Sequence, residues 1–251
     1  MASTTKIMTA HLVLQLIDNE PSILGETVTF SAAADQTDGS TCQLRAGEQI
    51  SVHELLYGLL LPSGNDASVA LAEHFGPRLE LPDDDGSEPS KPIDPVECFI
   101  AAMNRSAAEL NLTSTQFRNT HGLTEPGHFS SARDLMTLAR QAMKSSHFRQ
   151  YVGTSQRGCT VTGPGGYQRN LRWKNTNRLL KISGYDGVKT GTTSAAGSCL
   201  VSYGTRNGNA LIVVVLGSSS SDARYADTRN LFRWGFDQYS GGTDSPPGSA
   251  D

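Results

Sequence analysis

Hydrophobic positions follow two different patterns along the chain. Up to about residue 150, apolar side chains recur every three to four positions, which is the spacing of one helix face. This spacing predicts helices over residues 4–18, 52–61, 67–75, 95–110 and 132–143. After about Cys159 the apolar runs are shorter and rich in β-branched residues, which predicts strands over 187–193, 198–203 and 210–217. A hairpin turn at Arg206-Asn207-Gly208 joins the last two strands, and an amphipathic helix over 225–239 follows.

The chain is predicted to form one folded unit with a single interruption. Its 251 residues are enough to bury one substantial core. We predict one domain over residues 1–239, helical over about 4–150 and built of strands and a closing helix over about 155–239. Residues 81–95 (LPDDDGSEPSKPIDP) are acidic, proline-rich and nearly devoid of core side chains, so we interpret them as an inserted loop. Residues 240–251 have a linker-like composition and are predicted to be a disordered tail.

Three short motifs occur in a fixed order along the chain: Ser3-Thr4-Thr5-Lys6, Ser63-Gly64-Asn65 and Lys189-Thr190-Gly191. A serine hydroxyl is a weak nucleophile and needs a base within hydrogen-bonding reach. Ser3 and Lys6 are three positions apart on a predicted helix, so their side chains share one face. A free lysine keeps its proton at neutral pH, so Lys6 can be this base only if burial or a second cation, such as Lys189, lowers its pKa. Together the motifs indicate a serine acyl-transfer site.

Each motif taken alone also has a simpler structural explanation. Ser3 can cap the helix that follows it, Asn65 can be a turn residue, and Lys189 can be a solvated lysine near a strand end. The joint order of the three motifs favours the catalytic interpretation.

The motifs and their flanks resemble those of the penicillin-recognising serine enzymes, whose signature combines S-x-x-K, S-x-N and K-T-G. Within that group the chain is similar to the D-alanyl-D-alanine carboxypeptidases, which are low-molecular-mass penicillin-binding proteins, from Ala2 to about Tyr239. The resemblance rests on six stretches: ASTTKIMTA (2–10), PSGNDASVALAEH (62–74), TQFRNTHGL (115–123), HFSSARDLMTLAR (128–140), NTNRLL (175–180) and GYDGVKTGTTSAAGSCLVS (184–202).

The resemblance implies an α+β fold of the β-lactamase and penicillin-binding-protein type, in which an antiparallel sheet is flanked by helices and carries an inserted, mainly helical subdomain. In the family, several tens of residues precede the nucleophile motif and form the first strands of this sheet, whereas Ser3 follows only two residues. We therefore expect the sheet to lack its N-terminal strands.

The strand predicted at residues 211–216 gives an independent reason for this expectation. It is apolar throughout, as in a strand covered on both faces, yet only one neighbouring strand is predicted beside it. An edge strand of this kind has unpaired backbone groups and is prone to association. Our hypothesis is that the chain is an N-terminally shortened form, or that another segment or subunit covers this edge.

The resemblance also implies a reaction and a set of roles. The chain would be a serine-type carboxypeptidase that removes the terminal D-alanine from peptidoglycan stem peptides and is acylated by β-lactams. Lys6 would take the proton of Ser3, Ser63 would protonate the departing D-alanine, and backbone N–H groups of Ser3 and Thr192 would hold the oxyanion. The expected substrate-binding residues are Asn65 for the acyl-side amide and Lys189, Thr190, Gly191 and Thr192, with Arg224 as a helper, for the terminal carboxylate.

Three alternatives remain open from the sequence. A class A β-lactamase shares the three motifs but also needs a glutamate in an E-x-x-L-N string, and the nearest string here begins with Ala107. An esterase on the same scaffold and a non-catalytic, shortened homologue are the other two.

Composition argues against several other classes of protein. A net charge of −4 indicates neither nucleic-acid nor anionic-membrane binding, and no apolar run is long enough to span a bilayer. The four cysteines are far apart and H-E-x-x-H is absent, so we expect structural thiols, no metal and no cofactor. The chain shows no signal-peptide pattern, and an extracytoplasmic location, periplasmic or secreted, is implied by the resemblance alone. No oligomeric state is predicted.

Overall fold

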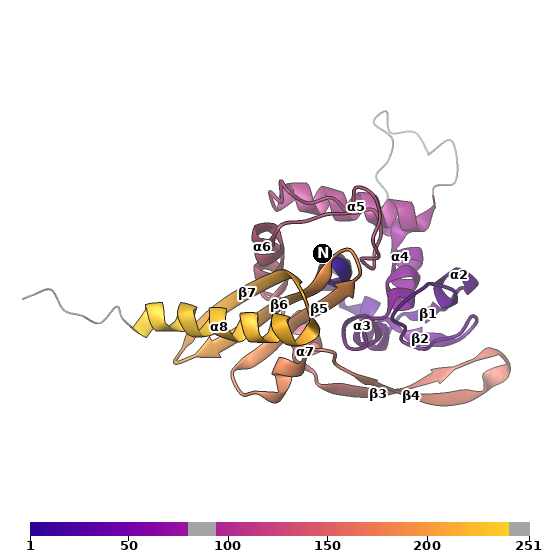
Figure 1. The fold of residues 1–251 in the computed structure, drawn as a ribbon. Coiled ribbons are helices and arrows are strands. Elements are labelled where there is room, and N and C mark those ends of the chain that lie inside the picture. Colours follow the sequence, from indigo (N-terminus) through magenta and orange to yellow (C-terminus); the bar gives the residue numbers. More distant parts are fainter. Residues whose placement is uncertain (80–93, 241–251) are drawn as a thin grey trace, which may run out of the picture.

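The computed structural model describes residues 1–79 and 94–240 (Figure 1). Most of the loop expected over 81–95, and the tail expected after residue 240, lie outside the described residues. The described part is an α+β fold with two antiparallel sheets and several helices, which confirms the expected fold class.

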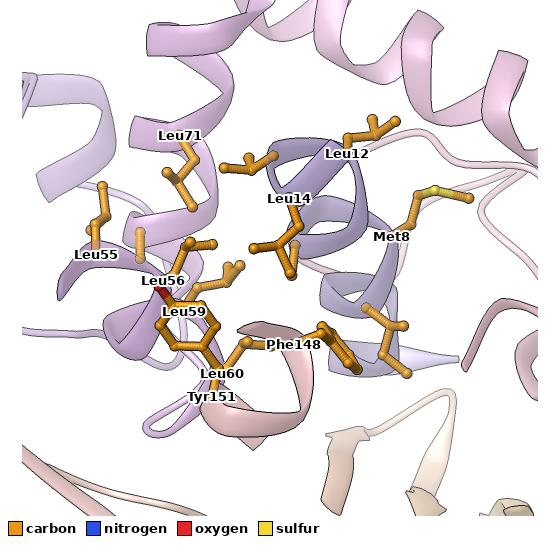
Figure 2. Packing of buried hydrophobic residues seen from close by; sticks show 14 of the residues in the cluster. Met8, Leu12, Leu14, Leu55, Leu56, Leu59, Leu60, Leu71, Phe148 and Tyr151 are labelled. Carbon is orange, nitrogen blue, oxygen red and sulfur yellow. The ribbon is translucent and has the colours of Figure 1, made fainter. Parts of the chain in front are cut away.

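Helix α1 (Lys6–Asn19) forms the centre of the hydrophobic core. It is apolar on almost every side, and a helix with this composition is stable only when its neighbours surround it. Figure 2 shows Leu14 and other α1 side chains facing those of α3 (Val52–Leu60), α4 (Asn65–Leu79) and α7 (Ser146–Gly153). The short turn of 3₁₀ helix η1 (Ala2–Thr5) precedes α1, so this packing also fixes the first motif.

The helices predicted from apolar spacing are confirmed at α1, α3, α4, α5 (Pro95–Glu109) and α6 (Ala132–Ala142). The starts of α3 and α6 are capped by side chains that accept from free backbone N–H groups: Ser51 accepts from Glu54, and Ser131 accepts from Asp134. Helix α4 is longer than predicted at both ends. Asn65 is therefore the first residue of a helix, and the prediction that it lies in a turn is wrong.

The three predicted strands form one sheet in the order β5 (Tyr185–Thr193), β6 (Gly197–Arg206) and β7 (Asn209–Ser218), with antiparallel pairing throughout. The turn between β6 and β7 has positive φ angles at Asn207 and Gly208, which suits a tight hairpin. Helix α8 (Ser221–Ser240) covers one face, where its Phe232 packs beside Val213 and Val215. The opposite face packs on the main core (Figure 1).

Strand β7 is covered on both faces, as its apolar sequence predicts, and it is also an edge. It pairs with β6 on one side, and no strand within residues 1–79 and 94–240 pairs with its other side.

Across the same residues, none of the helices has the length and apolar character needed to cross a membrane.

A second sheet was not predicted from the sequence. Its order is β1 (Thr27–Thr29), β2 (Gln49–Ser51), β3 (Gln156–Thr162) and β4 (Gln168–Lys174), and hairpin β3–β4 forms a long arm below α3 in Figure 1. The remaining short elements are η2 (Pro21–Gly25), α2 (Ala32–Asp35), η3 (Pro164–Gly166) and η4 (Arg178–Lys181). The segment that contains η4 leads from β4 to β5 and so connects the two sheets.

Candidate active site

Ser3 and Lys6 face each other where η1 passes into α1. Lys6 Nζ lies 3.2 Å from Ser3 Oγ, as the spacing of the motif predicts. It also donates to Asn65 Oδ1 at 2.6 Å and to the backbone carbonyl of His121 at 2.8 Å. Lys6 is fully buried, whereas Ser3 is half-buried. The hydroxyl is therefore held by a lysine that has no contact with solvent.

The surroundings of Lys6 favour its neutral form. Burial lowers the pKa of Lys6 well below that of a free lysine, and the charge of Lys189 lowers it further, against a smaller opposing effect of Asp66. The same two causes that sequence reasoning requires, burial and a second cation, are therefore both present. A neutral amine beside Ser3 Oγ is able to accept the serine proton.

Ser63 lies in the turn between α3 and α4 with a φ of 69°, a region that non-glycine residues rarely occupy. Lys189 Nζ donates to Ser63 Oγ at 2.9 Å and to the carbonyl of Thr190 at 3.0 Å. Burial, and then the nearby charge of Arg224, lower the pKa of Lys189 to about 7. The second and third motifs thus meet through one hydrogen bond.

The side-chain amide of Asn65 is engaged at both ends. Its oxygen accepts from Lys6, and its nitrogen donates to the carbonyl of Asp38 at 2.6 Å. The next residue, Asp66, is buried and accepts from the backbone N–H of Cys42 at 2.9 Å. In this arrangement Asn65 positions Lys6, and its amide nitrogen has a second N–H besides the one that donates to Asp38.

Strand β5 forms a wall directly against the first motif. A Cβ atom on Gly191 would lie 2.8 Å from the backbone nitrogen of Ser3, so only glycine fits between the two chains. Thr190 is buried and its hydroxyl lies 2.7 Å from the hydroxyl of Thr176. Thr192, which directly follows Gly191, is exposed. The third motif therefore places a backbone, rather than side chains, beside Ser3.

Arg224, in the first turn of α8, is buried against β5. Its Nη1 donates to the carbonyl of Gly191 and to Thr192 Oγ1, both at 3.0 Å. Only 7% of the residue is exposed. This geometry supports the strand that carries Thr192, and the expected helper role of Arg224 in binding the substrate carboxylate stays a prediction.

Residues 119–123 contribute a further wall that the motifs did not specify. Gly122 has a φ of +96°, and a Cβ atom there would lie 2.0 Å from the carbonyl oxygen of Ala2. The carbonyl of His121, one residue earlier, accepts from Lys6. Burial, followed by the charges of Lys6 and His128, lowers the pKa of His121 to about 4, so the imidazole is neutral at pH 7.

The sequence pointed to His121 only as part of the stretch 115–123 that carries the family resemblance. It missed Thr176 and the carbonyl of Asp38, because contacts made by a backbone atom or by a lone threonine leave no motif. Metal-binding residues are also not found in the described ranges, which contain no cluster of three or more His, Cys, Asp or Glu suited to an ion. The four cysteines form no disulfide.

Comparison with known proteins agrees with this geometry. The sequence profile of one family, described as D-alanyl-D-alanine carboxypeptidase, matches residues 1–220. The D-alanyl-D-alanine carboxypeptidase DacF of Bacillus subtilis is 36% identical over 247 residues, which cover 95% of this chain and 56% of that protein. The chain belongs to this carboxypeptidase family.

The share of a relative's length that this chain covers differs among family members. The D-alanyl-D-alanine carboxypeptidase of Streptomyces sp. (strain K15) is 38% identical over 237 residues, which cover 93% of this chain and 78% of that protein. A crystal structure of the DD-transpeptidase of that strain superposes with a TM-score of 0.84 at 37% identity, covering 94% of this chain and 87% of that one. The chain thus spans about half the length of some relatives, such as DacF, and most of the length of others.

Proposed function

We propose that this chain is a serine-type D-alanyl-D-alanine carboxypeptidase that acts through an acyl-enzyme on Ser3. The observation that carries the proposal is the buried Lys6, whose lowered pKa and 3.2 Å contact with Ser3 Oγ supply the base that a serine nucleophile needs. Family membership supplies the substrate class, a peptide that ends in D-alanyl-D-alanine.

Acylation begins when Lys6 takes the hydroxyl proton of Ser3. The Ser3 oxygen then attacks the carbonyl carbon of the penultimate D-alanine and forms a tetrahedral oxyanion. Backbone N–H groups of Ser3 and Thr192 are the proposed donors to this oxyanion, which is consistent with the close approach of β5 at Gly191. Each donor of this kind contributes on the order of a hundredfold to the rate.

Collapse of the tetrahedral species breaks the bond to the terminal D-alanine. Its nitrogen needs a proton to leave, and Ser63 is the proposed donor. Lys189 is hydrogen-bonded to Ser63 Oγ and has a pKa of about 7, so it is able to replace the proton that Ser63 gives up. Water then attacks the ester carbon, one water proton returns to Lys189, and Ser3 recovers its own proton from Lys6.

The carboxylate of the terminal D-alanine is assigned to the third motif. Lys189 provides a positive charge, and the exposed Thr192, with its neighbour Thr190, provides hydroxyl donors on the same strand. Arg224 supports this position through Thr192 and Gly191 and adds a second positive charge to the region. A β-lactam has an equivalent carboxylate beside a strained amide, so we expect it to acylate Ser3 as well.

We also infer that the enzyme acts outside the cytoplasm, periplasmic or secreted, because its proposed substrate lies in the cell wall. A β-lactamase is disfavoured, since Ala107 stands where the E-x-x-L-N string of class A enzymes has its glutamate. Such a carboxylate is what activates water in class A β-lactamases.

The decisive experiment combines covalent labelling with product release. Fluorescent penicillin should label the wild-type chain stably and should not label Ser3→Ala, while Ser22→Ala, at an exposed serine, should label normally. The hydroxyl of Ser3 contacts only Lys6 among the described hydrogen bonds, so we expect Ser3→Ala to fold. An unlabelled wild type, or a label on Ser3→Ala, would exclude the acyl-enzyme on Ser3.

Product analysis then separates the related activities. A peptide that ends in D-alanyl-D-alanine should release D-alanine, and its D-alanyl-L-alanine counterpart should not. Rapid loss of the penicillin label would instead indicate a β-lactamase. Since the solved relative from strain K15 is called a DD-transpeptidase, glycine should be added as an acceptor to test whether an amine replaces water.

A further inference from the structure

Positive charge is concentrated in one stretch of an otherwise acidic chain. Residues 135–185 contain no Asp or Glu, yet they hold nine of the 21 Lys and Arg residues. These nine are Arg140, Lys144, Arg149, Arg157, Arg169, Arg172, Lys174, Arg178 and Lys181. The net charge of −4 describes the whole chain and does not show this local excess of positive charge.

Some of these cations have structural partners elsewhere in the fold. Arg157 pairs with Glu54, Arg169 with Glu48, and Arg178 with the exposed Asp222. Lys174 and Lys181 are both exposed, and within the described residues neither forms an ion pair. They are two of the six cations of this stretch that form no ion pair within the described residues.

Lys174, Arg178 and Lys181 line one hollow, which we call the basic hollow. Its volume is about 430 Å³, and the rest of its lining consists of Leu180 and neutral polar residues, with no Asp or Glu. Arg178 is held in place by Tyr225, whose ring centre lies 4.3 Å from its guanidinium, and by its ion pair with Asp222. Since Asp222 offsets the charge of Arg178, Lys174 and Lys181 provide the unpaired charge of the hollow. The flexible ammonium groups and the ordered guanidinium together suit an anionic oxygen group such as a phosphate or a carboxylate.

The basic hollow is coupled to the candidate active site through the segment between β4 and β5. Asn177, in its wall, donates to the carbonyl of Gly187 on β5 at 2.8 Å. Thr176, the residue before it, contacts Thr190 of the third motif. A ligand in the basic hollow would lie against the segment that supports β5 without touching Ser3, Lys6 or Ser63.

We propose that the basic hollow is an anion-binding exosite for a linear polyanion whose repeating unit carries a phosphodiester or a carboxylate. One anionic group occupies the hollow between Lys174, Arg178 and Lys181. Neighbouring repeats lie along β4, where Arg172 is also exposed. Such a site would hold the enzyme on an anionic polymer while the separate Ser3 site cleaves a peptide substrate.

The test measures polyanion binding to the full chain at low and moderate salt. Sodium polyphosphate and poly-L-glutamate serve as phosphate and carboxylate probes, with titration calorimetry as the readout. The double variant Lys174→Gln/Lys181→Gln should weaken binding of the preferred probe by tenfold or more. The control Arg140→Gln/Lys144→Gln removes the same charge from the same stretch, away from the basic hollow, and should weaken binding less than twofold. Binding of either probe through Lys174 and Lys181 supports the exosite, and the preferred probe identifies the anionic group.

Three results would overturn the proposal. They are no binding by the wild-type chain, equal weakening by the two double variants, and tighter binding of duplex DNA than of polyphosphate. As a second readout, polyphosphate should protect Lys174 and Lys181 from acetylation, measured by mass spectrometry, and leave Lys144 reactive. All four residues that are changed are exposed, so we expect both double variants to fold. The binding test needs no turnover, so its failure leaves the Ser3 mechanism untouched, and failure of penicillin labelling leaves the exosite untouched.

Discussion

Two buried lysines take opposite protonation states in the proposed mechanism. Lys6 must be neutral to accept the proton of Ser3, and its buried position beside a second cation lowers its pKa. Lys189 must be charged to bind a carboxylate, and its pKa is about 7. The fraction of neutral Lys6 rises with pH, whereas the fraction of charged Lys189 falls as pH passes about 7.

We therefore predict a bell-shaped pH profile for kcat/KM of acylation by a carboxylate-bearing β-lactam. The alkaline side, near pH 7, belongs to Lys189. An ester of the same β-lactam should keep both sides, because Lys189 also replaces the proton of Ser63, but its kcat/KM at pH 7 should fall about tenfold or more because the carboxylate contact with Lys189 is lost. Stopped-flow acylation over pH 5–10 provides the measurement. An ester that acylates Ser3 as fast as the free acid at pH 7 would show that Lys189 does not bind the carboxylate.

The variant Lys189→Gln tests the coupling between the two lysines. Removing the charge of Lys189 relieves one of the two effects that lower the pKa of Lys6, so the acidic side should move to higher pH. The rate should also fall, by about a hundredfold or more, because Ser63 loses its proton source. Lys144→Gln, at an exposed lysine, should change neither side of the profile.

At the residue scale the sequence predicted the chemical groups better than their contacts. The pairs Ser3–Lys6 and Ser63–Lys189 meet as the three motifs suggest. The contacts of Asn65 and Arg224 could not be predicted from the sequence, because the partners of a buried side chain come from segments that are distant in sequence. Asn65 uses the carbonyl of Asp38, and Arg224 uses that of Gly191.

At the scale of elements, one buried carboxylate anchors the β3–β4 hairpin to the helical part. Glu48 is fully buried and accepts from Arg169 Nε at 2.6 Å, from Tyr167 at 2.9 Å and from the backbone of Arg45 at 2.8 Å. Arg169 and Tyr167 lie on the hairpin, in and beside β4. These partners, Arg169 first, lower the pKa of Glu48 to about 2.

We predict that Glu48→Gln destabilises the protein by about 3 kcal/mol at pH 7. Because the folded pKa lies below the unfolded one, the stabilisation from Glu48 is complete above about pH 4.5 and is lost as the pH falls towards 2. Urea unfolding between pH 2 and 7 should show that the gap between wild type and variant narrows in this window. The free energy of unfolding of Glu109→Gln, at an exposed residue, should stay within about 0.5 kcal/mol of wild type. An equal effect of both variants would contradict the role of Glu48 in anchoring the hairpin.

The sheet of β1, β2, β3 and β4 shows where the sequence could not predict strands. Strands β1 and β2 have only three residues each, which is too short for an alternating pattern to emerge. In β3 most positions are at least partly exposed, so its side chains give no apolar signal. The longer elements α1, α5 and β7 bury wide apolar surfaces, and their sequences predicted them well.

At the scale of the whole molecule, α1 joins the helical part to the sheet part. Its side chains form one core cluster with residues of α3, α4 and α7, and this cluster continues to Val188 of β5 and Val201 of β6. The edge of β7 and its hairpin with β6 followed from the sequence, but this central position of α1 did not. Helical spacing identifies an apolar helix without telling which elements surround it.

A single cluster of this kind predicts that both parts unfold together. Leu14 is 2% exposed near the middle of α1, so Leu14→Ala should cost about 2–5 kcal/mol. The two tryptophans report on different regions, Trp173 in β4 and Trp234 in α8. In Trp173→Phe and Trp234→Phe backgrounds, the remaining tryptophan should report the same urea midpoint as far-UV circular dichroism, and Leu14→Ala should lower both midpoints equally.

The neighbouring Gln15 provides the control for this experiment, because it is exposed on the same helix. Gln15→Ala should change stability by less than about 0.5 kcal/mol. If Leu14→Ala lowered the Trp173 midpoint and left the Trp234 midpoint unchanged, α8 and its sheet would be a separate folding unit. Ser3 and Lys6 contact Gly191 and Asn65 from both parts, so such independence would also mean that the site is assembled only when the two units dock. A shared midpoint would instead show that the core around α1 maintains the nucleophile, its base and β5 as one rigid arrangement.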